Sequence, residues 1–239
     1  MKSLIYATDY SKASLAALHC AQAMSRLLSM RLIVTHVYDV PTVLGTQLDG
    51  TFPELKKDAH KHETEKLQQF YQDHKSNDPD PEELRIEPVE NMSVLSGIIA
   101  KATEWHANLV VVGMKGESAL RELLIGSTTK KLIDKAPCPV LAIPANHRFE
   151  DIRSMVYATD FELEDLRALE KVVALAEVFD AEVRVVHVTN DREYAGPSQM
   201  EWFKSMARER IQYDRIHFEL LESRDIPNSL KNYTTHLNA

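Results

Sequence analysis

The chain has 239 residues, enough for one large domain or two modest ones. Hydrophobic residues make up 44% and charged residues 27% of the sequence, the shares of an ordinary soluble globular protein. The net charge of −8 argues against nucleic acid or an anionic membrane as the main partner. No apolar run approaches the roughly 18 residues of a membrane-spanning helix, so the sequence predicts no membrane span.

The first residues, MKSLIYATDYS, read directly as a strand and lack the apolar core and cleavage site of a signal peptide. Cys20 falls on an apolar helical stripe and Cys138 lies between two prolines, so both cysteines are interpreted as reduced packing residues. A cytoplasmic protein is therefore expected.

Apolar runs typical of strands alternate with helical patterns along the first part of the chain. The five runs lie at 3–8, 31–38, 84–90, 108–113 and 138–144. Ser11 and Ser93 are candidate helix N-caps, and Pro53 can open a third helix. Continuous β-branched runs between amphipathic helices predict an α/β fold with a parallel sheet covered on both faces.

Three of the seven glycines lie in one stretch, at Gly113, Gly116 and Gly126, and Ser127, Thr128 and Thr129 follow the last of them. A simple hypothesis is a strand-to-helix turn followed by a helix C-cap. The alternative is an anion site, because a helix that restarts after Gly126 presents free amides and hydroxyls. Glycines after a buried strand also let the backbone approach a ligand, and Lys115 adds a positive charge.

An internal repeat organises the chain. LIYATDYS at 4–11 recurs as MVYATDFE at 155–162, and LIVTHVYD at 32–39 recurs as VRVVHVTN at 183–190. Both matches have the same offset of 151 residues, which pairs Asp9 with Asp160 and His36 with His187. Two matches at one offset indicate a structural repeat.

The second copy, residues 152–239, shows strands at 153–159, 182–188 and 215–221 and helices at about 163–179, around Trp202 and at about 226–236. The sequence ends where a fourth strand is expected. The only glycine after Gly126 is Gly196, which is expected in a polar loop.

The spacing of Gly113, Gly116, Gly126 and Ser127 resembles the nucleotide-binding motif of the universal stress protein family. The resemblance extends to YATDYS at the first strand, THV at the second and CPVLAIP at the fifth, and so covers residues 1–146. The second copy resembles the same family over its first three strands only. The chain is therefore similar to a tandem member with an incomplete second module.

The resemblance implies a doubly wound, five-stranded parallel sheet in the order 3-2-1-4-5, with a ligand crevice between strands 1 and 4. It places the base and ribose of an adenine nucleotide beside Ala7, Thr8, Asp9 and Val37. It places the ribose and phosphates against Val112, Gly113, Lys115, Gly116, Gly126, Ser127 and Thr128. The implied ligand is ATP, or AMP or ADP, with or without Mg²⁺, and the fifth strand (138–144) commonly pairs two modules into a homodimer. Asp9 as a turn or capping residue is the alternative interpretation of that side chain.

Two classes of function remain open: a nucleotide-binding regulatory protein of the stress response, and an enzyme that hydrolyses ATP or transfers its adenylyl group. A non-binding, dimerising scaffold is a third. Phosphoryl transfer needs positioned metal ligands and extra positive charge, so little or no turnover is expected. The HKHETE run at 60–65 is interpreted as a solvated face, not a metal site, and His36 and His187 as core or loop-anchoring residues. The second module is expected to bind no nucleotide, because a fourth strand with its glycine loop is missing as the opposite wall of the crevice, and Asp160 suits a turn or cap.

Overall fold

A computed structural model of the protein describes residues 2–40, 52–114, 126–150, 152–189 and 196–237. The chain forms two compact units, residues 1–149 and residues 150–239. Of the helices that these residues form, none combines the length and apolarity needed to cross a membrane.

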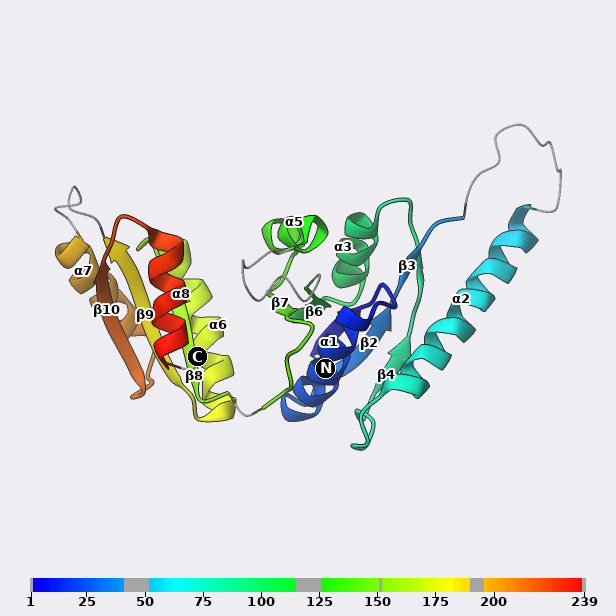
Figure 1. Ribbon diagram of the computed structural model, residues 1–239, viewed down its shortest axis with the longest axis horizontal. Coiled ribbons are helices and arrows are strands. Elements are labelled where there is room, and N and C mark those ends of the chain that lie inside the picture. The colour runs from blue at the N-terminus through cyan, green and yellow to red at the C-terminus, as the bar shows by residue number, and fades with distance from the viewer. Residues whose placement is uncertain (1, 41–51, 115–125, 151, 190–195, 238–239) are drawn as a thin grey trace. The chain divides into compact units, whose positions relative to one another are not determined.

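The first unit is built on a five-stranded parallel sheet in the order β4-β2-β1-β6-β7 (Figure 1). Its strands are β1 (Ser3–Ala7), β2 (Arg31–Thr35), β4 (Leu84–Ile86), β6 (Leu109–Gly113) and β7 (Val140–Ile143). This is the order 3-2-1-4-5 along the chain, so the fold class predicted from the sequence is confirmed. A separate two-stranded ladder joins β3 (Val37–Tyr38) to β5 (Val89–Glu90).

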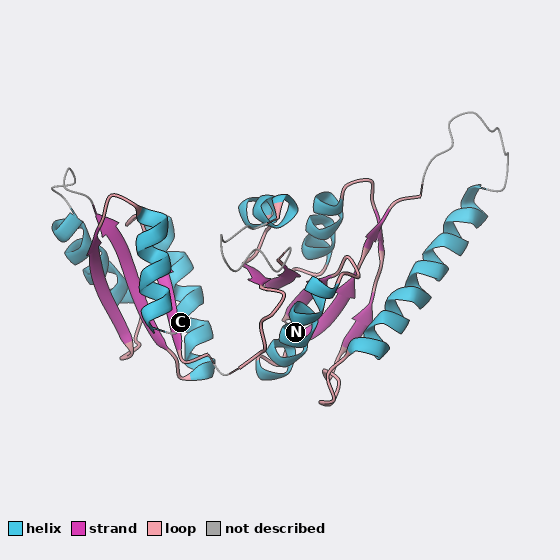
Figure 2. Cartoon of the chain, in the orientation of Figure 1, coloured by secondary structure: helices cyan, strands magenta, loops and turns pink. Residues whose placement is uncertain are grey.

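Helices cover both faces of this sheet (Figure 2). The helices are α1 (Lys12–Leu27), α2 (Phe52–His74), α3 (Val94–Glu104) and α5 (Ser127–Lys135). One buried cluster lies between the sheet and the helices α3 and α5, and it includes Ile5, Val110 and Leu132. Side chains of the opposite parity, such as Tyr6, face α1, where the Tyr6 hydroxyl donates to the Ser14 carbonyl at 2.8 Å. Alternation along β1 thus produces the two apolar layers.

The two predicted N-caps, Ser93 and Ser11, differ in whether their side chains cap the helix. The Ser93 hydroxyl accepts from the Ser96 amide at 3.3 Å, as a helix N-cap does. Ser11 occupies the N-cap position of α1 but makes no side-chain cap hydrogen bond. No side-chain hydrogen bond from Ser11 therefore caps α1, and no acidic side chain lies in its first turn.

The second unit contains a three-stranded parallel sheet in the order β10-β9-β8. Its elements are β8 (Ser154–Ala158), α6 (Leu163–Phe179), β9 (Glu182–Thr189), α7 (Gly196–Arg210), β10 (Ile216–Glu222) and α8 (Ile226–Leu237). Each lies within two residues of its expected range where a range was predicted. The expectation for Gly196 is wrong, because this residue begins α7 instead of lying in a loop.

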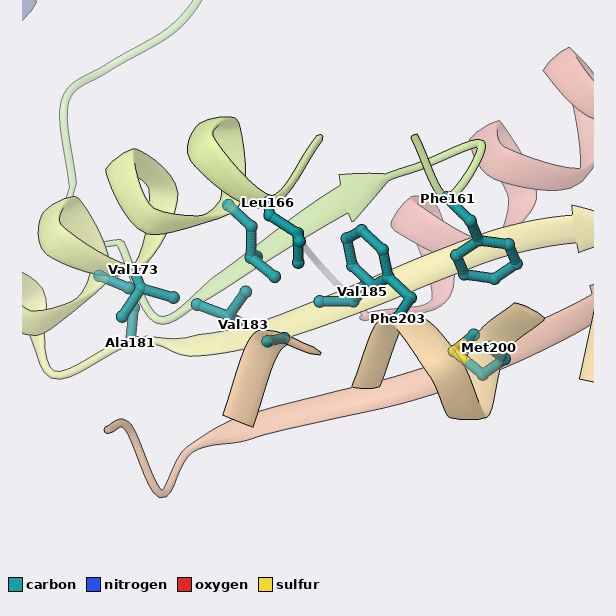
Figure 3. Close-up of a cluster of buried hydrophobic side chains, with 11 residues drawn as sticks. Phe161, Leu166, Val173, Ala181, Val183, Val185, Met200 and Phe203 are labelled. Carbon is teal, nitrogen blue, oxygen red and sulfur yellow. The ribbon is translucent and has the colours of Figure 1, made fainter. Parts of the chain in front are cut away.

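The core of the second unit lies on one face of its sheet. Leu166 and Val173 of α6, Val183 of β9 and Phe203 of α7 are buried together there (Figure 3). The helix α8 contributes no fully buried residue. Among the described residues no strand pairs with the free edge of β8.

Candidate functional site

A cavity of about 250 Å³ lies in the first unit, where the strand order reverses between β1 and β6. In open α/β sheets ligands bind at this switch point, beyond the carboxyl ends of the strands. Nine of the residues expected at a site line this cavity: Ala7, Thr8, Asp9, Val37, Val112, Gly113, Gly126, Ser127 and Thr128. The remaining two, Lys115 and Gly116, lie outside the described residues.

The lining also contains residues that were not singled out as site residues: Ser11, Ala13, Ser14, His36, Val94, Ile98, Met114 and Thr129. Ser11, Ala13 and Ser14 belong to the start of α1, directly after Asp9, and Val94 and Ile98 are one helical turn apart in α3. The spacing of Val94 and Ile98 was a usable signal, because it marks one face of the helix. That this face of α3 lines the cavity depends on tertiary packing, which cannot be read from a single sequence.

Asp9 lies in the tight loop between β1 and α1. Its Oδ1 accepts from the Ser11 amide at 3.0 Å, a local turn that fixes the carboxylate at the cavity rim. The next residue, Tyr10, has a left-handed backbone with φ of 62°. Its amide donates to the Thr8 hydroxyl oxygen at 3.0 Å. Asp9 is therefore both a turn residue and an exposed cavity residue, so the two interpretations of this side chain are compatible.

A chain of hydroxyls connects the loop to α1. The Ser14 hydroxyl donates to the Ser11 carbonyl at 2.7 Å. Because its one proton is used there, the 2.9 Å contact between Thr8 Oγ1 and Ser14 Oγ has Thr8 as the donor. These groups are neutral. The amino terminus of α1, which carries the positive end of the helix dipole, thus faces the cavity without a carboxylate in its first turn.

Gly113 is required by the packing of α1 against β6. A Cβ at this position would lie 2.7 Å from the Ala13 carbonyl oxygen and 3.0 Å from the Ser14 Cα. The expected reason for this glycine was close approach of a ligand. The structure gives a different one: the backbone that approaches here is that of α1.

Gly126 is the N-cap of α5, with φ of −57° and ψ of 149°. Any residue can adopt this conformation, so the backbone does not demand glycine here. Ser127 and Thr128 follow as exposed residues of the first turn, which contains no acidic side chain. A second helix amino terminus with two free-standing hydroxyls therefore opens into the same cavity.

The apolar wall of the cavity depends on a glycine inside α3. A Cβ at Gly97 would lie 2.7 Å from Val37 Cγ1 and 2.8 Å from Val37 Cγ2. Glycine is unfavourable in a helix interior, so its presence marks a close contact. Without a Cβ, Val37 packs flat against α3, and together with Ile98 it leaves an apolar slot open.

His36 interrupts the second strand and holds the end of the first. Its Nδ1 donates to the Thr8 carbonyl oxygen at 2.8 Å, and its ring lies 4.2 Å from that of Tyr10, centroid to centroid. Tyr10 also contacts α2: its hydroxyl donates to Glu63 at 3.4 Å, and the ammonium of Lys66 lies 4.4 Å from its ring centroid. Burial raises the pKa of Tyr10 above its usual range, and the nearby carboxylate of Glu63 raises it further. His36 thus anchors the loop, in agreement with the role inferred from the repeat.

Charge at the cavity is sparse. The described lining residues include one carboxylate, Asp9, and no lysine or arginine. Over the part of the chain that the structure describes, no three or more His, Cys, Asp or Glu side chains are grouped so as to hold a metal ion. The features of the described lining that suit an anion are therefore two helix amino termini and several hydroxyls.

The sequence profile of the universal stress protein family matches residues 1–144 and 151–224. The chain belongs to this family. Two segments match, so the membership extends to both halves and fits a tandem arrangement. 

Individual relatives of known family support this membership. A universal stress protein of Thermus aquaticus is 30% identical over 149 residues, which cover 59% of this chain and 98% of that protein. One from Methanocaldococcus jannaschii is 25% identical over 145 residues, covering 59% of this chain and 81% of the relative. The crystal structure of a universal stress protein from Archaeoglobus fulgidus superposes with a TM-score of 0.67 at 16% identity, covering 99% of this chain and 84% of the other. At that identity the similarity concerns the fold alone.

Proposed function

We propose that the first unit is a regulatory module that binds ATP, or AMP or ADP, with little or no turnover. The observation that carries the proposal is the convergence on one cavity of two helix amino termini free of acidic residues. The starts of α1 and α5 both line it, and both are suited to phosphate. The apolar slot beside Val37 and Ile98 suits an adenine ring, and the Asp9 carboxylate at the rim suits a ribose hydroxyl.

The same cavity supports binding better than catalysis. Phosphoryl transfer needs metal ions, a group that orients the nucleophile and positive charge on the transferred phosphate. Among the described lining residues, Asp9 is the one carboxylate that could ligate a Mg²⁺ carried in by the phosphates. We therefore propose turnover well below the roughly 1 per second of ordinary enzymes. Phosphate release above that rate, proportional to protein concentration, would favour the enzyme hypothesis instead.

The proposal is tested by titration calorimetry with ATP on the parent chain and on Gly126→Val. The variant places a branched side chain at the N-cap of α5, where the backbone itself accepts any residue. We expect the affinity to fall at least tenfold, whereas the thermal unfolding midpoint should fall only slightly, because valine is a poorer N-cap than glycine. Gly126→Ala is the matched control and should lose less. Equal ATP affinity in the parent chain and in Gly126→Val would rule out this cradle for the phosphates.

Two further expectations belong with this function. We propose that the protein acts in the cytoplasm and that two chains pair through the edge strand β7. That strand lies at the end of the sheet, with β6 as its partner among the described residues. An apolar edge strand with open backbone groups favours association.

A further inference from the structure

The second unit contains a cavity of about 320 Å³ that corresponds, residue by residue, to part of the cavity in the first unit. At the offset of 151 residues, Ala158, Thr159 and Asp160 replace Ala7, Thr8 and Asp9. Val188 occupies the place of Val37. The helix α8 takes the role of α3, with Ile226 and Leu230 one turn apart, as Val94 and Ile98 are.

The local geometry is conserved along with the lining. His187 Nδ1 donates to the Thr159 carbonyl at 2.7 Å, as His36 does to Thr8 at 2.8 Å. Phe161 has a left-handed backbone with φ of 64° and stacks on His187 with ring centroids 4.4 Å apart. The loop that carries Asp160 is therefore built in the same way as the loop that carries Asp9. The Asp160 side chain is 90% exposed at the rim of the cavity.

The start of the following helix is acidic in the second unit and neutral in the first. Where the first unit has the hydroxyls of Ser11 and Ser14, the second has the carboxyls of Glu162 and Asp165, and both line the cavity. Asp165 Oδ2 accepts from the Thr159 hydroxyl at 2.7 Å and from the Asp160 and Glu162 amides at 3.2 Å each. The two amides just before α6, those of Asp160 and Glu162, thus donate to the protein's own carboxylate, and the two carboxyl groups at the start of the helix repel anions.

We infer that this cavity is a second ligand site, for a purine nucleoside that carries no phosphate. The apolar side chains of Val188, Ile226 and Leu230 form a slot for a flat base, and the exposed Asp160 carboxylate accepts hydrogen bonds from ribose hydroxyls. Glu162 and Asp165 are equivalent to Ser11 and Ser14, which lie at the helix start proposed to hold phosphate in the first unit. The choice of a nucleoside rests on the proposed function of the first unit, whose base-and-ribose half this cavity reproduces.

The test uses the full chain saturated with ATP, so that the first unit is filled. Adenosine is then titrated into the parent chain, and AMP is titrated separately. We expect about one adenosine bound per chain, and AMP at least tenfold weaker. Leu230→Trp fills the slot from a half-buried position on α8 and should abolish adenosine binding without changing ATP affinity. In Glu162→Gln, which leaves the hydrogen bonds of Asp165 intact, AMP should gain several-fold and adenosine should be unchanged.

No adenosine uptake by the ATP-saturated chain, or equal uptake by Leu230→Trp, would overturn the inference. AMP binding to the second site as tightly as adenosine would overturn its charge selectivity. Failure of the proposed function has a different signature: ATP would then bind neither the parent chain nor Leu230→Trp. In that case, comparing adenosine binding by these same two proteins, without ATP, still decides whether the second slot is a site.

Discussion

The imidazole Nδ1 of His36 lies 2.8 Å from the carbonyl oxygen of Thr8, the residue that immediately precedes Asp9. A carbonyl can only accept, so the proton of the neutral ring resides on Nδ1. This bond ties the end of β2 to the end of β1 and fixes the direction in which the Asp9 loop leaves the sheet.

Replacing His36 with alanine should therefore weaken ATP binding. The lost hydrogen bond stabilises the closed loop by about 1 kcal/mol, so a loop that opens in its absence lowers the apparent affinity by up to roughly fivefold. His187→Ala is the matched control, because it breaks the equivalent 2.7 Å bond to Thr159 in the other unit. Calorimetry should show weaker ATP binding for His36→Ala and no change for His187→Ala. Equal effects would show that the two histidines act only on overall stability.

Gly113→Ala should destabilise the first unit even without ligand. The new Cβ would lie 2.7 Å from the Ala13 carbonyl oxygen, so α1 must shift away from β6. Overpacking of this kind costs about 1–3 kcal/mol. Gly126→Ala serves as the comparison and should change stability by less than about 1 kcal/mol, because its backbone angles suit any residue. Urea unfolding of the two variants distinguishes these cases; equal stability would contradict the packing role of Gly113.

These glycines show where prediction from the sequence succeeds and fails. The strands and helices follow from apolar runs, which are local properties, and the placement of Gly113 and Gly126 at one crevice follows from a spacing that resembles the family motif. The reason for Gly113 does not, because the atom that it accommodates belongs to Ala13, about 100 residues earlier in the chain. The same holds for Gly97 and Val37, and for the contact of Tyr10 with Glu63. Lys115 and Gly116 remain predictions.

Ionisation of Tyr6 should limit stability at alkaline pH. Burial raises the pKa of this tyrosine from 10.0 to about 12, although the hydroxyl side chains of Ser14 and Thr8 act in the opposite direction. The folded pKa is the higher one, so the stabilisation of the neutral form is complete below pH 10 and is lost as the pH rises toward 12. 

Tyr6→Phe should be less stable than the parent by about 1 kcal/mol at pH 8, because it lacks the hydrogen bond to the Ser14 carbonyl. Between pH 10 and about 12 this difference should shrink and then reverse, because the variant has no phenol to ionise at this position. Chemical unfolding at a series of pH values measures the difference. A constant difference across that range would contradict the raised pKa.

Pairing of two chains through β7 should be disrupted by Ala142→Pro. The carbonyls of Pro139 and Ile143 accept from Val110 and Met114 on the β6 side. Alternate residues of a strand point their polar groups to opposite sides, so the amide of Ala142 faces the open edge. A proline there removes an outward donor, which edge strands tolerate. Light scattering at micromolar concentration should give a dimer for the parent and a monomer for the variant; a monomeric parent chain would contradict the pairing.

The most direct test of the central claim is the number of ATP molecules bound per chain at saturation, measured for the parent, Asp9→Ala and Asp160→Ala. Both aspartates lie two residues after the first strand of their units, but only Asp9 shares its cavity with helix termini whose first turns contain no acidic residue. The account predicts one ATP per chain, weakened by Asp9→Ala and unaffected by Asp160→Ala. No bound ATP, two ATP per chain, or equal losses from the two substitutions would contradict it.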